Sequence, residues 1–469
     1  MSQGTLASVK PSGIVTVALL IAAAIGLGVM PAPPNVDGRV MPMLAILLLT
    51  VGLWATAPIP QYLTALGFFA LCLAFDVAPL RAVTSGITSS ALWLVAGGLM
   101  IGVAADRSGF GAYVAQRFFG VFRGSFAGLV GAVLLGSTVL SFLVPASMGR
   151  LAIVVPVVIA LAKDAGYERG SRGFLALIMI TVAGNFLVSQ GVLPANLLNI
   201  MIVGSGEALY GLQVSYVQYL WLCAPVLMVV KAFIIWGATC WLFPAPVPAL
   251  GARGEGATKP AMSAQAKTVA VILTAAIVLW STDFLHGFAP GWVALAAGVA
   301  CLTPGLKLLT WRDCLDERRV GMLIWVAAVL SLGAVLSSSG AGPLIAKQII
   351  ALAGVEGRSA LYGYGAIALM TPILTSLCTT GGGIPIIAST VGEIAQLTGM
   401  PLETAILTIV AGQSVVFFPY TTAPIVFGLM LGGISTRDAL RYMVPIALIS
   451  LVTIVPLNAL WWWWIGALP

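Results

Sequence analysis

The chain has 469 residues, of which 60% are hydrophobic and only 8% are charged. Soluble domains carry about 25% charged residues, so this composition and the mean hydropathy of +1.07 predict an all-α polytopic membrane protein. The net charge of +7 comes from Lys and Arg in short loops between apolar runs, which indicates membrane topology and argues against nucleic-acid binding. The six Cys are scattered without a CxxC pair, so we expect no disulfide framework, no zinc site and no cofactor.

In chain order, the first apolar run lies at 14–30 and lacks a small-residue cleavage site, so we expect it to be a retained span. Two similar sets of segments follow, each with five crossings and one shorter apolar hairpin. The crossings of the first set lie near 41–56, 60–76, 89–104, 174–203 and 216–243, with a hairpin at 126–162. Those of the second set lie near 269–286, 290–305, 321–336, 402–433 and 440–466, with a hairpin at 360–398. The pattern predicts about 11 transmembrane helices plus two re-entrant hairpins.

Internal matches indicate that the fold is duplicated. DRSGFGAYVAQ at 106–116 matches SSSGAGPLIAK at 337–347, and LSFLVPASMG at 140–149 matches LTSLCTTGGG at 374–383. These pairs are 231 and 234 residues apart, and the nearly equal offsets favour two copies of one unit. Because each copy has an odd number of crossings, the copies should form an inverted repeat.

The distribution of charge supports the inversion independently. Basic side chains fall on one side by the count of crossings: Arg107, Arg117, Arg123, Lys163, Arg169, Arg172, Lys307, Arg312, Arg318, Arg319, Arg437 and Arg441. The opposite loops 204–217 and 391–404 contain Glu but no Lys or Arg. The positive-inside rule therefore places 105–125 in the cytoplasm and 337–358 outside, with Lys347 and Arg358 as exceptions. We expect a bacterial inner-membrane protein with a cytoplasmic N-terminus.

One crossing of each copy is interrupted near its middle. Gly191 and Pro194 interrupt NFLVSQGVLPANLLNI (185–200), and Pro419 and Pro424 interrupt GQSVVFFPYTTAPIVFG (412–428). Polar side chains gather at both breaks: Asn185, Ser189, Gln190, Asn196 and Asn199 in the first, and Gln413, Ser414, Tyr420, Thr421 and Thr422 in the second. Isolated polar residues often only tie membrane helices together. Their coincidence with both breaks favours an ion or solute site.

The two hairpins have breaks of their own, at PASMGR (145–150) and CTTGGG (378–383). We expect the run of Gly to free backbone N–H groups for a bound group. Arg150 is the only charge in the apolar stretch 140–162, and a charge at mid-membrane costs about 2.5–3.5 kcal/mol. Three interpretations stay open for this side chain: contact with an anionic substrate, which we favour, bonds to backbone carbonyls, or snorkelling to the cytoplasmic face.

The chain resembles the divalent anion/sodium symporter family over nearly its whole length. The resemblance is carried by LWLVAGGLMIGVAADRSGFG and LIWVAAVLSLGAVLSSSGAG before the two arms, by LTWRD at 309–313 and by the broken crossings. LPAN (193–196) and TTAP (421–424) stand where the family has a Thr-Pro-Pro-Asn type motif. Residues 146–148 and 379–381 stand where it has Ser-Asn-Thr motifs that contact sodium and the substrate carboxylate. Both tips lack the Asn, so the sequence leaves the presence of Na+ sites open.

The resemblance implies a homodimer of elevator type and a division of the chain into scaffold and transport parts. Residues 1–40 would form the N-terminal segment and first span. The first repeat (41–243) would comprise scaffold 41–107, arm 108–124 and transport part 125–243. A cytoplasmic linker (244–267) would join it to the second repeat (268–469), with scaffold 268–338, arm 339–356 and transport part 357–469.

We therefore expect a secondary transporter that moves a small organic anion, a di- or tricarboxylate or a sulfonate, by an elevator mechanism coupled to exchange, H+ or Na+. Its partners would be the anionic solute, the lipid bilayer and a second copy of the chain. The predicted substrate-binding residues are Arg150, Ser147, Ala146, Pro145, Thr379, Thr380, Gly381, Gly382, Asn196, Pro194, Thr421, Thr422 and Pro424, and the breaks are also lined by Asn185, Gln190, Gln413 and Ser414.

Three alternatives are weighed against this expectation. A cation/proton antiporter needs carboxylates within the membrane, whereas Asp76, Asp106, Asp164 and Asp283 fall near the ends of the spans. A membrane-embedded enzyme needs an acid/base pair or a metal cluster at depth, and the sequence shows neither. A channel is disfavoured by the closed arrangement of two hairpins.

Overall fold

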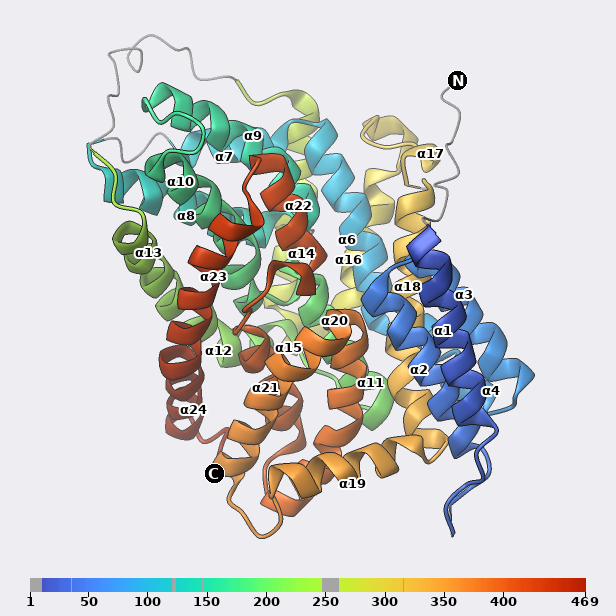
Figure 1. The fold of residues 1–469 in the computed structure, drawn as a ribbon. Coiled ribbons are helices and arrows are strands. Elements are labelled where there is room, and N and C mark those ends of the chain that lie inside the picture. The colour runs from blue at the N-terminus through green and yellow to red at the C-terminus, as the bar shows by residue number, and fades with distance from the viewer. Residues whose placement is uncertain (1–10, 35, 120–123, 146, 247–260, 315) are drawn as a thin grey trace.

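The computed structural model describes residues 11–469 with gaps at 35, 120–123, 146, 247–260 and 315 (Figure 1). The regular elements within these ranges are helices, and no strand is present among them. Eight of the described helices are long and apolar enough to cross a membrane by themselves. The prediction of an all-α polytopic membrane protein is therefore confirmed.

The N-terminal span and the first part of each copy form a common framework. Its helices are α1 (Pro11–Gly28), α2 (Val40–Thr56), α3 (Gln61–Ala74), α4 (Leu80–Val83), α5 (Ser85–Thr88) and α6 (Ser90–Arg107), followed in the second copy by α14 (Ala264–Ser281), α15 (Asp283–His286), α16 (Pro290–Cys301), η6 (Pro304–Leu306), α17 (Trp311–Cys314) and α18 (Glu317–Ser338). Where α6 crosses α16, a Cβ on Gly97 would lie 2.2 Å from the carbonyl oxygen of Ala294. Only Gly allows this backbone contact, which joins the two copies.

The arm of each copy is a helix with one buried and one exposed face. These helices are α7 (Phe110–Phe119) and α19 (Ala341–Ala353), and they lie at opposite ends of the molecule (Figure 1). Their placement agrees with two copies that run through the molecule in opposite directions.

A helical hairpin follows each arm. The first consists of α8 (Phe126–Leu143) and α9 (Ser147–Asp164). The second lies within α20 (Ala360–Thr398), which is divided at Thr379 by a backbone with φ 57° and ψ 172°. A Cβ on Gly383 would lie 3.1 Å from the Cα of Thr375. Residues eight positions apart in a straight helix are about 12 Å apart, so the chain reverses direction here as predicted.

The two interrupted crossings are broken where the sequence predicts. In the first copy, α10 (Arg172–Ala183) continues through η1 (Gly184–Val188), η2 (Ser189–Gly191) and η3 (Leu193–Ala195) to α11 (Leu197–Tyr210). In the second, α21 (Leu402–Gln413) is followed by η7 (Pro419–Thr421) and α22 (Ala423–Gly432). One interpretation is wrong, because Pro424 lies in the first turn of α22 and does not interrupt a helix. Pro is tolerated there since its missing N–H has no helical partner at that position.

The last crossing of each copy contains a π-helical turn. These crossings are α12 (Tyr216–Ala224), η4 (Pro225–Val230) and α13 (Lys231–Leu242), and α23 (Thr436–Ile449), η8 (Ser450–Ile454) and α24 (Val455–Trp464). The linker ends earlier than the predicted residue 267, because α14 already begins at Ala264. The Ser263 hydroxyl caps this helix by accepting a hydrogen bond from the N–H of Ala266 (3.0 Å).

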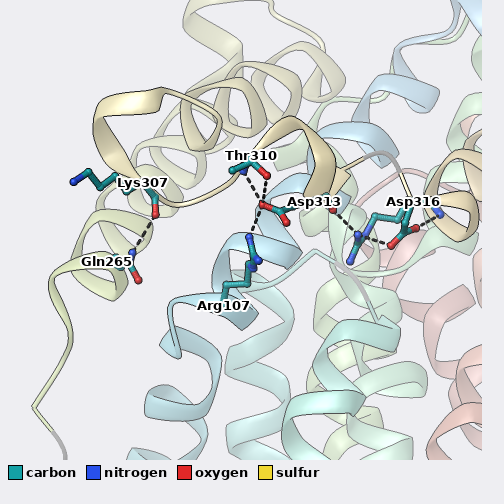
Figure 2. A network of polar contacts seen from close by, with 7 residues as sticks. Arg107, Gln265, Lys307, Thr310, Asp313 and Asp316 are labelled. Carbon is teal, nitrogen blue, oxygen red and sulfur yellow. Dashed lines mark hydrogen bonds and ion pairs between the residues drawn. The ribbon is translucent and has the colours of Figure 1, made fainter. Parts of the chain in front are cut away.

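A polar network fixes the LTWRD loop at the end of α6 (Figure 2). Asp313 accepts hydrogen bonds from the hydroxyl (2.6 Å) and the N–H (2.7 Å) of Thr310, and it pairs with Arg107. These bonds from Thr310, followed by the charge of Arg107, hold the pKa of Asp313 below its ordinary value. Asp316 caps α18 and pairs with Arg319 (2.6 Å). The network therefore ties α6 of the first copy to α17 and α18 of the second.

Candidate functional site

Each hairpin tip is hydrogen-bonded to the broken crossing of its own copy, and both copies do this at the same place. The Ser147 hydroxyl donates to the backbone oxygen of Ala195 (3.1 Å), and the Thr380 hydroxyl donates to that of Thr421 (3.3 Å). Both acceptors directly precede the residue that caps the second half-helix. The two copies therefore present equivalent pairs of a tip and a break.

The backbone geometry of the two breaks is also nearly the same. Asn196 occupies the N-cap position of α11 with φ −135° and ψ 128°, and Thr422 occupies that of α22 with φ −136° and ψ 122°, but only Asn196 makes a side-chain capping bond. In both, extended backbone passes directly into helix, so the first N–H groups of the half-helix lack partners within the helix. This repetition supports the duplication predicted from weak sequence matches.

Helices of one copy pack on helices of the other around the tips. α9 packs on α22, where a Cβ on Gly428 would lie 3.3 Å from the side chain of Leu151. α11 packs on α20, where the Tyr210 hydroxyl donates to the backbone oxygen of Ala388 (2.7 Å). α9, α11, α22 and the second arm of α20 all begin at these tips and breaks, in the middle of the molecule (Figure 1). Helix N-termini carry partial positive charge and favour anions.

Arg150 lies at the first tip with all five guanidinium N–H groups bonded to the chain. Nη1 donates to the backbone oxygens of Val144 (2.6 Å) and Ala195 (2.9 Å). Nη2 donates to the backbone oxygen of Asn185 (2.7 Å) and to Ser147 Oγ (3.3 Å), and Nε donates to Asn185 Oδ1 (3.2 Å). The side chain is fully buried, and no carboxylate in the described ranges pairs with it.

This geometry separates the three interpretations of Arg150. Snorkelling is wrong, because the side chain has no exposed surface. Bonds to backbone carbonyls are present. Direct contact with an anion is not part of this arrangement, since each donor already faces an oxygen of the chain. The guanidinium thus joins the tip of the first hairpin to the first break through hydrogen bonds.

The rest of the first break, 184–196, is buried and internally bonded. Asn196 Oδ1 accepts from the N–H of Leu198 (3.2 Å), and its amide donates to the backbone oxygen of Phe186 (3.3 Å). The other polar side chains of this break also donate to oxygens of the chain; they are Asn185, Ser189, Gln190 and Asn199. The first break therefore has no unused polar side chain.

The second break is different. Thr422 Oγ1, Ser414 Oγ and Gln413 Nε2 are buried without a hydrogen-bond partner in the described part of the chain. Beside them, Phe418 and Tyr420 are 40% and 58% exposed and stack with ring centroids 5.6 Å apart. The second break thus reaches the surface of the chain and retains polar groups that nothing in the chain satisfies.

Both tips also touch framework helices. A Cβ on Gly98 of α6 would lie 3.1 Å from the backbone oxygen of Pro145, and a Cβ on Gly381 would lie 2.7 Å from the ring of Trp325 on α18. The run of Gly at the second tip therefore has a steric reason, which is close approach to the framework. The expectation that it frees N–H groups for a ligand stays a prediction.

The remaining predicted residues lie at the same tips and breaks. They are Pro194 and Thr421, both buried, Gly382 at the second tip, half-buried Thr379 at the kink of α20, and Pro424 at the start of α22. Ala146 lies outside the described residues. The structure thus brings together, around two tips and two breaks, the residues that the sequence proposed from separate segments.

Sequence reasoning missed Lys231. It is fully buried at the start of α13, and Nζ donates to Gln190 Oε1 (3.1 Å) and to the backbone oxygen of Ser414 (3.0 Å). The signal was present, because Lys231 is the only charge in the crossing 216–243, just as Arg150 is in its hairpin. A charge at mid-membrane is by default a candidate for function.

A cavity of about 170 Å³ lies between the framework and α11, away from the tips. On its wall, Glu207 accepts from the hydroxyl (2.8 Å) and the N–H (3.3 Å) of Ser90, and Asp283 accepts from the N–H of Tyr216 (2.6 Å). Two carboxylates repel an anion. This cavity is therefore poorly suited to an anionic solute.

Two copies with arms at opposite ends, each with a broken crossing bonded to a hairpin, form the architecture of a secondary transporter. The family described as "Sodium:sulfate symporter transmembrane region" matches residues 12–468, and the chain belongs to this family, the divalent anion/sodium symporters. It is therefore a multi-pass secondary transporter for anionic solutes and not an enzyme.

Curated relatives agree with this membership. A "Membrane protein" of Cupriavidus necator is 24% identical and covers 95% of this chain and 92% of its own length. The "Putative malate transporter YflS" of Bacillus subtilis is 23% identical over 71% of each chain, and an "Uncharacterized transporter" of Haemophilus influenzae is 21% identical over 98% and 100%. The crystal structure of the Alcanivorax borkumensis YdaH transporter aligns with a TM-score of 0.53 and 14% identity, over 98% of this chain and 99% of that one. This likeness shows the fold.

Proposed function

We propose that this protein carries a small organic di- or tricarboxylate, or a related sulfonate, and binds it between the two hairpin tips. The observation that carries the proposal is that four helices begin at the tips and breaks, and that one of them begins after Thr422, whose buried hydroxyl has no partner in the described chain. A carboxylate needs such donors, and N–H groups at helix ends together with a free hydroxyl supply them. The printed name of the Bacillus subtilis relative, a putative malate transporter, favours a dicarboxylate.

Arg150 would supply a permanent positive charge to this site without touching the solute. The guanidinium occupies a cage of three backbone oxygens, one amide oxygen and one hydroxyl. Oxygen atoms of these kinds are also the ligands of small hard cations. Because the guanidinium takes them in the first copy, we propose that transport needs no Na+ there and is driven by exchange or by protons.

The movement would be of elevator type, in a homodimer of the bacterial inner membrane with a cytoplasmic N-terminus. The elements that would move are the hairpins and broken crossings, and the two hairpin tips contact the framework at Gly98 and Gly381. Contacts between Gly and a neighbouring backbone or flat ring lack interlocking side chains, which favours sliding. The basic loops at one end, among them Arg107 and Arg312, support the orientation.

The proposal is tested in two steps with the purified protein. A thermal-shift screen of succinate, malate, citrate, isethionate and sulfate identifies the solute class, because a ligand at about 100 times its dissociation constant adds roughly 2.7 kcal/mol to stability. Uptake of each stabilising anion is then measured in proteoliposomes with Na+ and with choline in its place. We expect at least one carboxylate or sulfonate to be transported at rates within about twofold in the two media.

Two results would contradict the proposal. One is stabilisation and transport only of cationic solutes, which would point to the antiporter alternative. The other is uptake that stops when choline replaces Na+, which would show that Arg150 does not substitute for a coupling ion. Empty liposomes give the background, and ethanolamine, screened beside the anions, is the cationic solute that reports the antiporter alternative.

A further inference from the structure

Lys231 lies where the first half-helices of both copies end. The first half-helix of copy one ends at Gly191, and that of copy two ends at Gln413. Gln190 donates through Nε2 to the backbone oxygen of Gln413 (2.8 Å), and its Oε1 accepts from Lys231, which also donates to the backbone oxygen of Ser414. Helix C-termini carry partial negative charge. The ammonium group therefore lies between two negative helix ends that face each other.

The position of Lys231 is deep in the membrane-spanning part. The crossing runs from Tyr216 to Leu242, and Lys231 is about 22 Å along the helix from its start and about 17 Å from its end. Its side chain has no exposed surface. Neither distance can be bridged by a Lys side chain of about 6 Å, so the charge stays inside the protein.

No ionised group in the described ranges pairs with Lys231. The helices that pack on its crossing contribute Tyr219 and Cys223 from α12, Cys240 from α13 itself, and Tyr442 from α23, and α8, η1, η2, η3, η8 and α24 contribute no titratable side chain. α14 and α15 contact α12 and carry Lys267, Asp283 and His286; Asp283 accepts from the N–H of Tyr216, which is about 22 Å along the crossing from Lys231. The charged residues of the same elements lie at far helix ends; they are Arg172 on α10, Glu403 on α21, and Arg437, Asp438 and Arg441 on α23. The ammonium is thus held by neutral oxygens alone, and two of its three N–H groups have partners.

The surroundings can satisfy Lys231 with or without its proton. The charged form donates to Gln190 Oε1 and to the Ser414 carbonyl. The neutral amine needs a donor for its lone pair, and two unused donors belong to the adjacent residues, namely Ser414 Oγ and Gln413 Nε2. Arg150 differs on both counts, because a guanidinium does not lose its proton in proteins and all five of its donors are bonded.

We propose that Lys231 is the proton-carrying group of this transporter, so that each anion moves together with a proton. On release, one Nζ–H bond breaks, the electron pair stays on Nζ, and the proton passes to water on the side that the site then faces. On loading, water on the other side returns a proton to Nζ. This inference rests on the proposed function.

The charges explain why the proton and the anion move together. With the anion bound at the helix N-termini, the ammonium offsets its charge inside the membrane domain. Without the anion, a charged Lys231 adds to the fixed charge of Arg150, which disfavours the empty carrier in its protonated form. The empty carrier therefore returns with a neutral amine, and net transport requires a proton each time.

The experiment compares two modes of transport in proteoliposomes for the wild type, Lys231→Arg and Lys231→Met. Counterflow exchanges labelled for unlabelled anion and needs no change of protonation, whereas net accumulation is driven by an imposed pH gradient with the membrane potential clamped by valinomycin and K+. For the wild type we expect accumulation of about tenfold or more in vesicles that are alkaline inside. For Lys231→Arg we expect counterflow within about threefold of the wild type and loss of the pH-driven accumulation.

Lys267→Arg, an exposed substitution on α14, is the matched control and should keep both modes. Persistence of pH-driven accumulation in Lys231→Arg or Lys231→Met would overturn the inference. If neither variant folds, the wild type still decides, because a pH electrode records whether protons enter with pulses of anion. Anion uptake without proton movement would overturn the inference and leave the proposed function intact, whereas absence of uptake for every anion tested would overturn the proposed function itself.

Discussion

The two copies have the same backbone at their breaks but different chemistry. Asn196 and Thr422 occupy the N-cap positions of their half-helices with dihedral angles that differ by at most 6°, and both hairpin tips bond to the residue before the N-cap. In the first copy, Arg150 fills the space between tip and break and satisfies it completely. In the second copy the tip (378–383) and the break (414–422) contain no Lys or Arg, the nearby cation is Lys231 of the first copy, and Thr422 Oγ1 has no partner in the described chain.

Under the proposed function, the two halves of the duplicated fold would have different roles: the first would supply a fixed positive charge and the second would bind the solute. The fixed guanidinium of Arg150 would, under the proposed function, give the first break a positive charge that no ion has to supply in each cycle and that cannot be released. The second break keeps buried polar groups without partners in the described chain beside the exposed rings of Phe418 and Tyr420, and under the proposed function these groups would serve a solute that enters and leaves. The two halves should therefore respond differently to matched substitutions.

The largest effect is expected at Arg150. Arg150→Met removes five hydrogen bonds and leaves Val144 O and Asn185 Oδ1 buried without a donor, whereas Ala195 O and Asn185 O keep the hydroxyls of Ser147 and Ser189. Each buried group without a donor costs about 1–3 kcal/mol. We expect the midpoint of thermal unfolding in detergent to fall by on the order of 10 °C. Transport should be lost as well.

Arg150→Lys is the matched control. An ammonium keeps the charge but has three donors for five acceptors, so we expect an intermediate midpoint and residual transport. An unchanged unfolding midpoint in Arg150→Met, together with lost substrate binding, would show that the guanidinium serves the solute directly and would restore the interpretation favoured from the sequence alone.

Much of the arrangement at the breaks could be predicted from sequence, because Pro and Gly within apolar spans are strong local signals. Gly191 and Pro194 marked the first break correctly. Pro424 misled, since the same residue type both interrupts helices and begins them. The partners of Arg150 could not be predicted, because they depend on where backbone oxygens of distant segments lie after folding. Lys231 was predictable from its isolation in an apolar crossing and was overlooked.

The next effect separates binding from stability at the two caps. Thr422→Val replaces a buried hydroxyl that has no partner in the described chain, so folding should be unchanged or slightly stabilised. Affinity for the anion should fall about tenfold, which corresponds to about 1.4 kcal/mol. Titration calorimetry and thermal unfolding of the same sample measure both quantities.

Asn196→Ala is the counterpart in the first copy. It removes a cap from α11 and a bond to Phe186, so we expect a loss of about 1–2 kcal/mol in stability, with affinity within about threefold of the wild type. The reverse pattern, with Thr422→Val unstable and Asn196→Ala defective in binding, would show that the solute is held by the first copy.

The smallest effect is expected at the hydrogen bonds from Ser147 and Thr380, which are equivalent in the two copies. It tests whether the charge of Arg150 adds to the stabilisation that Ser147 provides. Ser147→Ala removes the donor to Ala195 and also the hydroxyl that accepts from Arg150 Nη2, whereas Thr380→Val removes only the bond to Thr421. Hydrogen bonds to charged groups are stronger than neutral ones, so Ser147→Ala should cost about 1.5 kcal/mol and Thr380→Val about 0.5 kcal/mol. In an Arg150→Lys background the two costs should become equal, because the ammonium no longer needs the Ser147 hydroxyl. Equal costs already in the wild-type background would mean that the bond from Arg150 Nη2 to the Ser147 hydroxyl adds nothing to stability. The hydrogen bonds of the two tips would then contribute equally to the free energy of unfolding, although the tips differ in sequence.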